Sequence, residues 1–292
     1  MILIGENLNV ISKRIGEALK QRDPGPIQEM ALAEANAGMD LLDINLGPAR
    51  KEGAGLMEWV VKVVQEVCDL PLSLDTTNVE AMEAGLGVHK GKALINSISA
   101  RPERIEALMP LAKKYNASFI GLTLGVEGIP RDANERGLLA AQTIAEAANY
   151  GIPEEDIWID PIVLPINTQQ IQVQGCTEFV MMLPELAPNS KSTCGLSNVS
   201  NGAPADLRGI LNKTYLIMLK RYCMYSAIVD AFDEELKAIA KGKMPELEAL
   251  VYKVMDGEEV DLSKLSKEEM NYVKTTKVLI GKTLYSDSWL EL

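Results

Sequence analysis

The sequence predicts an α/β protein with a (β/α)8 (TIM) barrel and a C-terminal helical extension. Eight short apolar segments, most ending in a polar residue, alternate between residues 2 and 230 with longer helical segments. The apolar segments lack polar alternation, which is typical of strands buried on both faces of a parallel sheet. A doubly wound open sheet shows the same alternation, but the count of eight favours the barrel. No GxGxxG turn follows the first segment, which argues against a dinucleotide-binding open sheet.

The individual elements follow from this alternation. Strands are predicted at 2–7, 41–45, 72–75, 93–96, 118–123, 157–160, 193–198 and 226–230. Helical segments are predicted at 27–37, 57–67, 79–86, 102–115, 137–149, 168–183 and 207–222.

The chain changes character after the eighth strand. Residues 233–292 are rich in charge, with a helix break at Lys241–Pro245 and a turn and loop at 256–263. Ser266 with Glu269 three residues later is a capping-box pattern and predicts a further helix start. We therefore predict a single domain over 1–292, with the barrel at 1–235 and a helical segment at 236–292. This segment is expected to pack on the barrel wall or to be available for partner contact.

Composition excludes several functions. The chain of 292 residues has 41 acidic and 29 basic side chains, a net charge of −12, which argues against nucleic acid and against anionic membrane surfaces. One histidine and four cysteines without CxxC spacing leave no recognisable zinc or iron–sulfur site, so no bound metal is expected. The N-terminal apolar run is too short for a signal peptide, and no stretch has transmembrane length. A cytoplasmic protein is expected.

The carboxyl ends of the predicted strands carry the chemistry. They present acids, amides and hydroxyls in succession, namely Glu6, Asp43, Asn45, Asp75, Asn96, Thr123, Asp160, Asn198 and Asp230. In a barrel these ends converge on one face, where active sites lie. A single Asp or Asn at the end of one strand needs no functional explanation, because turns prefer these residues. A whole series without Lys or Arg is harder to explain by turns alone.

The residue types indicate the kind of ligand. A phosphorylated substrate would require Lys, Arg or a glycine-rich helix start, which the strand ends lack. Carboxylates and amides instead accept hydrogen bonds from a neutral heterocycle rich in N–H groups, and Asp75, Asn96 and Asp160 suit a 2-amino-4-oxo pyrimidine. Magnesium held by carboxylates is the competing use. It is less favoured because amides alternate with the acids.

Five motifs then point to a known family. They are Leu74-Asp-Thr-Thr-Asn78, Leu94-Ile-Asn-Ser97, Ile159-Asp-Pro161, Gly195-Leu-Ser-Asn-Val-Ser200 and Asp230-Ala-Phe-Asp233. Together they resemble the pterin-binding barrels, and most of all the corrinoid-dependent methyltetrahydrofolate methyltransferases. The resemblance covers residues 1–235 and resumes near 283–288. Residues 240–275 look longer than in the simplest members.

The resemblance implies an activity. The enzyme would move a methyl group between N5 of tetrahydrofolate and the cobalt of a corrinoid, with cob(I)alamin as the nucleophile. The cobalamin would be carried by a partner corrinoid protein, because His89 does not match the DxHxxG pattern of cobalamin modules. His89 is instead expected in a surface turn before the fourth strand. A homodimer is a further implication.

The resemblance also implies residue roles. Asp75, Asn96 and Asp160 match positions that bind the pterin ring, and Asn198 matches a mobile, catalytic asparagine near N5. Arg208 matches an arginine that reaches the outer folate, and Asn201 stands where relatives carry a longer amide. Glu6, Asp43 and Asp230 are expected to support the site. Asn198 cannot titrate, so N5 would be protonated from solvent or through Asp43, Asp75 and Asp160, with pKa values raised by proximity.

Two alternatives stay open. A dihydropteroate synthase shares the barrel and the pterin pocket, but it needs a Lys near the sixth strand and an Arg-x-His at the eighth, which this sequence lacks. A non-catalytic folate-binding subunit would need the pterin-binding acids but not Asn198.

Overall fold

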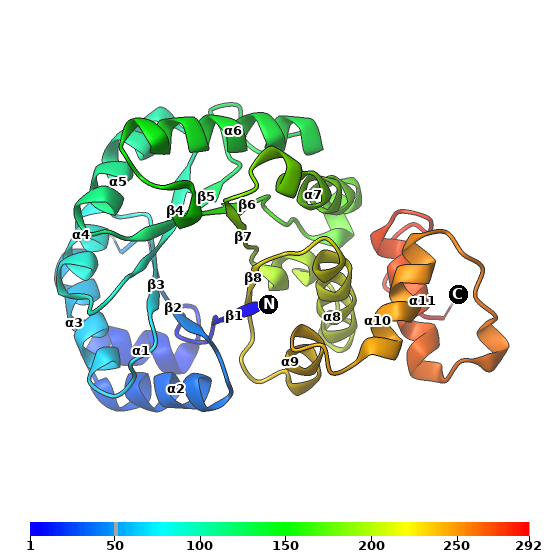
Figure 1. Ribbon diagram of the computed structural model, residues 1–292. Coiled ribbons are helices and arrows are strands. Elements are labelled where there is room, and N and C mark those ends of the chain that lie inside the picture. Colours follow the sequence, from blue (N-terminus) through cyan, green and yellow to red (C-terminus); the bar gives the residue numbers. More distant parts are fainter. Residues whose placement is uncertain (50–51, 292) are drawn as a thin grey trace.

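The protein forms a nearly closed barrel of eight parallel strands, as the predicted alternation required. The structure is a computed structural model that describes residues 1–49 and 52–291. The strands are β1 (Ile2–Gly5), β2 (Leu41–Gly47), β3 (Leu72–Thr76), β4 (Leu94–Ser99), β5 (Ser118–Leu122), β6 (Ile157–Asp160), β7 (Lys191–Ser192) and β8 (Ser226–Val229). Their spatial order is β7-β6-β5-β4-β3-β2-β1-β8. Figure 1 shows the helices arranged around this curved sheet.

The helices lie outside the sheet. They are α1 (Lys13–Gln21), α2 (Pro24–Asn36), α3 (Gly53–Gln65), α4 (Val79–Val88), α5 (Pro102–Lys114), α6 (Ala133–Asn149), α7 (Ile166–Leu186), α8 (Ala205–Arg221), α9 (Glu234–Ala240), α10 (Pro245–Met255) and α11 (Lys267–Leu279). Helix α1 was not predicted. It buries only Ile15, Ala18 and Leu19 in an otherwise charged segment, and it ends just before the proline that begins α2. None of the described helices combines the length and apolar character needed to cross a membrane.

Apolar side chains fill the interior of the barrel away from the carboxyl ends of the strands. The site is therefore confined to the end of the barrel where the strands finish. Ile4, Leu94, Ile120 and Trp158 form a separate apolar cluster with side chains from four different strands. A much larger core lies between the sheet and the surrounding helices. Inward side chains nearer the carboxyl ends of the strands are polar instead. The apolar cluster thus forms the floor of a polar mouth.

The predicted seventh strand at 193–198 is wrong. Strand β7 contains only Lys191–Ser192, and Leu196–Ser200 forms a 3-10 turn, η2. Between them the chain stays extended, and Cys194 O accepts a hydrogen bond from Ile228 N at 2.8 Å. A single parallel bridge joins Gly195 to Ile228, so β7 and β8 close the barrel loosely. The turn carries Asn198 away from the sheet and over the mouth.

The C-terminal segment packs on the outer wall of the barrel. Helices α10 and α11 contact α8, and α11 also contacts α7, as Figure 1 shows in orange and red. The amide of Gln170 on α7 donates to the carbonyl oxygens of Val278 and Thr283, both at 2.7 Å. The buried Trp289 donates from Nε1 to Thr275 Oγ1 at 3.0 Å. The predicted capping box at the start of α11 is confirmed.

Candidate functional site

Strand register brings the acids and amides of β2, β3 and β4 together. Asn45 is the register partner of Asp75, and Asp75 is the register partner of Asn96. The amide of Asn45 donates to an Asp75 carboxylate oxygen. Asp43 Oδ1 accepts hydrogen bonds from Ser73 Oγ at 2.5 Å and from Asn96 Nδ2 at 2.9 Å. Four of the predicted strand-end residues therefore form two linked acid–amide pairs.

Burial changes the acidity of this group. Asp43 is 3% exposed, and its burial raises the pKa of its carboxyl against the lowering effect of the two hydrogen bonds it accepts. Burial also raises the pKa of Asp75, and the charge of Asp43 raises it further. Two neighbouring carboxylates in a site of low dielectric do not both ionise readily. The pair therefore retains a proton towards neutral pH.

Asp160 lies at the end of β6 in a different environment. Burial raises its pKa to about 6, while backbone N–H groups and the positive charge of Arg136 favour the ionised form. One of these groups is the Ile162 N–H, which donates to Asp160 Oδ1 at 2.7 Å. Arg136 is fully buried behind this loop and donates from Nε to the Pro161 oxygen at 2.8 Å. At pH 7 Asp160 is thus mainly a carboxylate, and its loop is held from behind.

Asn198, Asn201 and Arg208 form a chain of contacts at the exposed rim. Asn201 Nδ2 donates to Asn198 Oδ1 at 3.2 Å, and Arg208 Nη2 donates to Asn201 Oδ1 at 3.5 Å. Arg208 Nε also donates to Ser200 Oγ at 3.3 Å. All three residues of the chain are exposed. The structure therefore brings the three predicted residues of the η2–α8 region together.

Glu6 and Asp230 join the same mouth from β1 and β8. Ser197 Oγ, next to Asn198 in η2, donates to Glu6 Oε1. Asn7 Nδ2 donates to Asp230 Oδ1 at 3.0 Å. Burial raises the pKa of Glu6, and the charges of Asp230 and Asp43 raise it further, while Arg208 opposes them. The supporting acids thus share one electrostatic environment with the pair on β2 and β3.

Glu34 is an acid at this mouth that the sequence analysis missed. It lies on α2, is 0% exposed, and accepts a hydrogen bond from the Asn7 N–H at 2.9 Å. Burial raises its pKa to about 8, and Asp43, Asp230 and Glu6 add to the effect. Its signal was the spacing with Ile27 and Ala31, which places Glu34 on the buried face of its helix.

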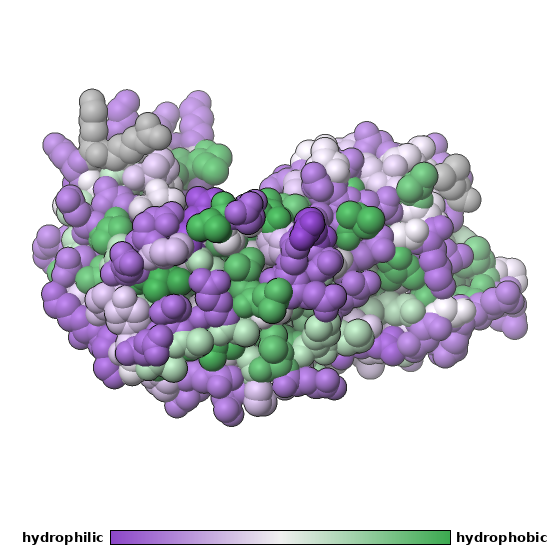
Figure 2. Space-filling model, turned by 90° about the horizontal axis from the view of Figure 1, so that it is seen from above, coloured by the Kyte–Doolittle hydropathy of each residue, from purple (hydrophilic) through white to green (hydrophobic). Residues whose placement is uncertain are grey.

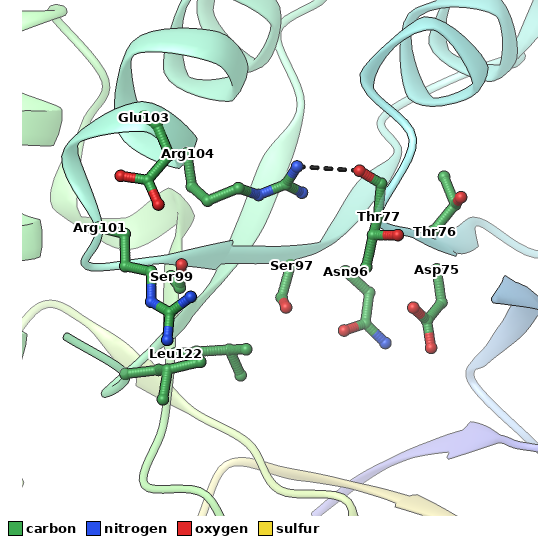
Figure 3. Close-up of a pocket in the computed structure, with 11 residues that line it drawn as sticks. Asp75, Thr76, Thr77, Asn96, Ser97, Ser99, Arg101, Glu103, Arg104 and Leu122 are labelled. Carbon is green, nitrogen blue, oxygen red and sulfur yellow. Dashed lines mark hydrogen bonds between the residues drawn. The ribbon is translucent and has the colours of Figure 1, made fainter. Parts of the chain in front are cut away.

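Two arginines were missed as well. A cavity of about 250 Å³ is lined by Asp75 and Asn96 at one end and by Arg101 and Arg104 from the start of α5. Figure 3 shows Asp75 and Asn96 on one side of this pocket and Arg101 and Arg104 on the other. Arg101 follows β4 by two residues, so a reading restricted to the last strand residue overlooked it. Across the described residues, no cluster of three or more His, Cys, Asp or Glu side chains could hold a metal ion.

The fold and the acid–amide mouth define a class of protein. Residues 5–229 match the family described as pterin binding enzyme, so the chain belongs to this family.

Individual relatives narrow the comparison. The chain is 27% identical over 238 residues to a methylcorrinoid:tetrahydrofolate methyltransferase of Eubacterium limosum, covering 81% of this chain and 87% of the relative. It is 28% identical to methionine synthase of Mycobacterium tuberculosis, covering 84% of this chain but only 21% of that larger protein. A solved structure of Xanthomonas albilineans dihydropteroate synthase in complex with 7,8-dihydropteroate matches with a TM-score of 0.58. It is 19% identical and covers 83% of this chain and 92% of that one, which shows the shared fold.

Proposed function

We propose that this protein transfers a methyl group between N5 of tetrahydrofolate and the cobalt of a corrinoid carried by a partner protein. The observation that carries the proposal is the pair of Asp75 and Asn96, which line one cavity at the ends of adjacent strands, with Asp160 at the carboxyl end of β6 on the same face of the barrel. The similarity to a methylcorrinoid:tetrahydrofolate methyltransferase over most of both chains supports this reaction.

The pocket chemistry suits the edge of a pterin ring. Asn96 uses its NH2 group on Asp43, which leaves its carbonyl oxygen as an acceptor for the ligand. Asp160, ionised at neutral pH, can accept two N–H donors from a ring nitrogen and its adjacent amino group. Asp75 completes the set from β3. These three residues are the proposed pterin-binding groups.

Asn198 is the proposed catalytic residue. Its carbonyl oxygen accepts a hydrogen bond from Asn201 and is exposed at the rim, so it can exchange this partner for a protonated N5. A tertiary amine is a poor leaving group unless it is protonated, and a hydrogen bond to the protonated form lowers the barrier. The carboxyls of Asp43 and Asp75, which together retain a proton, are the proposed source of the N5 proton. A corrinoid brought by the partner would supply the cobalt that accepts or donates the methyl group.

Arg208 and Asn201 are proposed to act together on the outer folate. Asn201 links the Arg208 guanidinium to the Asn198 amide, so it can transmit the position of a bound substrate to the catalytic oxygen. Glu6 and Asp230 are proposed as supporting acids of the same mouth.

The two alternative functions, a dihydropteroate synthase and a non-catalytic folate-binding subunit, lead to different expectations. A dihydropteroate synthase needs an Arg-x-His after the eighth strand, yet the one histidine of the sequence, His89, caps the C-terminal end of α4. There it accepts a hydrogen bond from Leu72 N at the start of β3, opposite the mouth. A non-catalytic folate-binding subunit would bind folate but would not react with cob(I)alamin.

The decisive experiment is a spectrophotometric assay with free cob(I)alamin and 5-methyltetrahydrofolate. We expect turnover by the wild type, and a loss of about 100-fold in Asn198→Ala with a much smaller change in folate affinity. Asn149→Ala, an exposed asparagine at the far end of α6, serves as the matched control. Folate binding without turnover in either direction would support the binding subunit. Absence of folate binding would refute the proposal.

We also propose a homodimer that uses the outer faces of α6 and α7. Four large apolar side chains are exposed there: Leu138, Ile171, Met181 and Leu186, with Leu138 at 72% and Ile171 at 74%. Figure 2, which views the molecule from above with respect to Figure 1, shows apolar side chains among polar ones on that face. Exposed apolar side chains gathered on neighbouring elements are typical of protein–protein contacts.

A further inference from the structure

The turn that follows β6 holds Asp160 through an unusual backbone conformation. Ile162 has a φ of +62°, in the left-handed region that β-branched residues rarely adopt. In this conformation its N–H group donates to Asp160 Oδ1 at 2.7 Å. A strained backbone of this kind persists only where the surrounding contacts fix it. The contacts around residues 161 and 162 therefore decide how Asp160 is presented to the mouth.

Two helices behind the turn supply those contacts. From α6, Arg136 Nε donates to the Pro161 oxygen at 2.8 Å. From α7, the Cys176 thiol donates to the Ile162 oxygen at 3.1 Å. The guanidinium fits beside α7 because residue 175 is glycine, where a Cβ would lie 3.2 Å from Arg136 Nη1. The carbonyl groups of both turn residues are thus held by donors that lie outside the sheet.

Arg136 is fully buried, and its hydrogen bonds leave its charge intact. Nη1 donates to the Asp132 backbone oxygen at 3.2 Å, and Nη2 donates to Gln172 Oε1 at 2.7 Å. These two acceptors and the Pro161 oxygen are all uncharged. A guanidinium stays protonated in proteins, so a full positive charge lies in a region of low dielectric behind Asp160. Such a charge stabilises the ionised form of a nearby carboxyl group.

Two further titratable groups face Asp160, and both are neutral near pH 7. They are the thiols of Cys176 on α7 and of Cys194 in the extended segment after β7, and burial raises the pKa of each. Burial also raises the pKa of Asp160, and the charge of Arg136 limits that rise. The thiols do not oppose this effect of Arg136, because they carry no charge at this pH.

We propose that Arg136 is a positioning residue for pterin binding. Its bond to the Pro161 oxygen keeps the turn in the conformation that directs Asp160 at the ring, and its charge keeps that carboxyl group ionised. Arg136 thereby sets the lowest pH at which the protein binds its pterin tightly. This inference rests on the proposed function, because it requires Asp160 to accept hydrogen bonds from the ring.

The test is isothermal titration calorimetry with 5-methyltetrahydrofolate from pH 5 to pH 8. Arg136→Gln removes the charge, so the fall in affinity on acidification should begin about one pH unit higher than in the wild type. Gln172→Glu keeps Arg136 but places a carboxylate at Nη2, and the fall should move up by roughly half a unit. If Arg136→Gln does not fold, the shift in Gln172→Glu decides, because this variant retains the guanidinium and its bond to Pro161.

Two more variants separate the charge of Arg136 from its contacts. Arg136→Lys keeps the charge but cannot bond all three acceptors, so we expect the pH dependence of the wild type with an affinity about tenfold lower throughout. Arg131→Gln is the matched control, since Arg131 lies just before α6, is exposed and pairs with Glu135. It should follow the wild type. Protonation of the ligand affects all variants alike, so only differences between them count.

The same pH dependence in the wild type, Arg136→Gln and Gln172→Glu would overturn the inference, because Arg136 would then only fill space behind the turn. An unchanged affinity in Arg136→Lys would remove its part in holding the turn. If the wild type binds no folate at any of these pH values, the proposed function itself fails.

Discussion

Glu34 offers a measurable consequence of burying an acid beneath the mouth. It is fully buried, its Oε2 has no hydrogen-bond partner, and its pKa is raised from an ordinary 4.5 to about 8. The perturbation is Glu34→Gln, which keeps the shape and the acceptor for the Asn7 N–H but cannot ionise.

The sign and size of the effect follow from proton linkage. The folded state holds the Glu34 proton more tightly than the unfolded state, so its contribution to stability is complete below about pH 4.5. It is lost as the pH rises towards 8. Each pH unit in this window costs about 1.4 kcal/mol. Between pH 5 and pH 8 the wild type should therefore lose about 3.5 kcal/mol through this group, and the Gln variant should lose none of it.

The assay is urea unfolding of both proteins at several pH values from 5 to 8. We expect the two free energies of unfolding to be similar near pH 5 and the variant to become the more stable protein as the pH rises. Glu17→Gln, at an exposed position on α1, should follow the wild type throughout. A difference between wild type and Glu34→Gln that stays constant with pH would refute the assignment of a raised pKa to this residue.

Three other variants test the site and the assembly. Asp160→Asn should weaken pterin affinity about 30-fold at pH 7 by loss of a charge-assisted pair. We expect the affinity of the wild type to fall below about pH 6, where Asp160 becomes protonated, and the variant to lose this fall; calorimetry across pH checks both. Arg136→Ala should lower the free energy of unfolding by about 3 kcal/mol in urea titrations, because it leaves three buried or half-buried acceptor oxygens without their donor. Leu138→Asp combined with Ile171→Asp should give a monomeric mass by light scattering, whereas Leu262→Asp on the 3-10 turn η3 (Leu262–Lys264) should leave a dimer.

The fold could be predicted from the sequence because the same pattern, an apolar strand followed by a helix, occurs again and again along the chain. Eight apolar segments at regular intervals identify a barrel even when single boundaries are off. The seventh strand failed as a local prediction, since Thr193 and Cys194 are buried like strand residues but lie outside β7. Their backbone does bond to both neighbours, yet the chain turns into η2 immediately afterwards. A pattern of burial cannot distinguish an extended connection from a paired strand.

The site was predictable to the extent that it lies on strand ends. Asp75 and Asn96 were placed correctly beside each other because adjacent parallel strands share a register. Glu34, Arg101 and Arg104 lie on helices, and their distance from the mouth depends on how each helix packs on the sheet. The ion pairs and backbone contacts that decide whether such a charge is free or neutralised are tertiary, so a single sequence carries no direct signal for them.

The acids at the mouth have a common property that bears on the direction of the proposed reaction. Glu6, Glu34, Asp43 and Asp75 all have raised pKa values, chiefly through burial, so the mouth holds protons at a pH where exposed carboxyls have lost them. Transfer of a methyl group away from N5 consumes a proton at that nitrogen, and the reverse transfer releases one. In the proposed reaction, these acids would speed removal of the methyl group from N5 as the pH falls and its addition to N5 as the pH rises. We therefore expect the rates of the two directions of the proposed reaction to depend on pH in opposite ways.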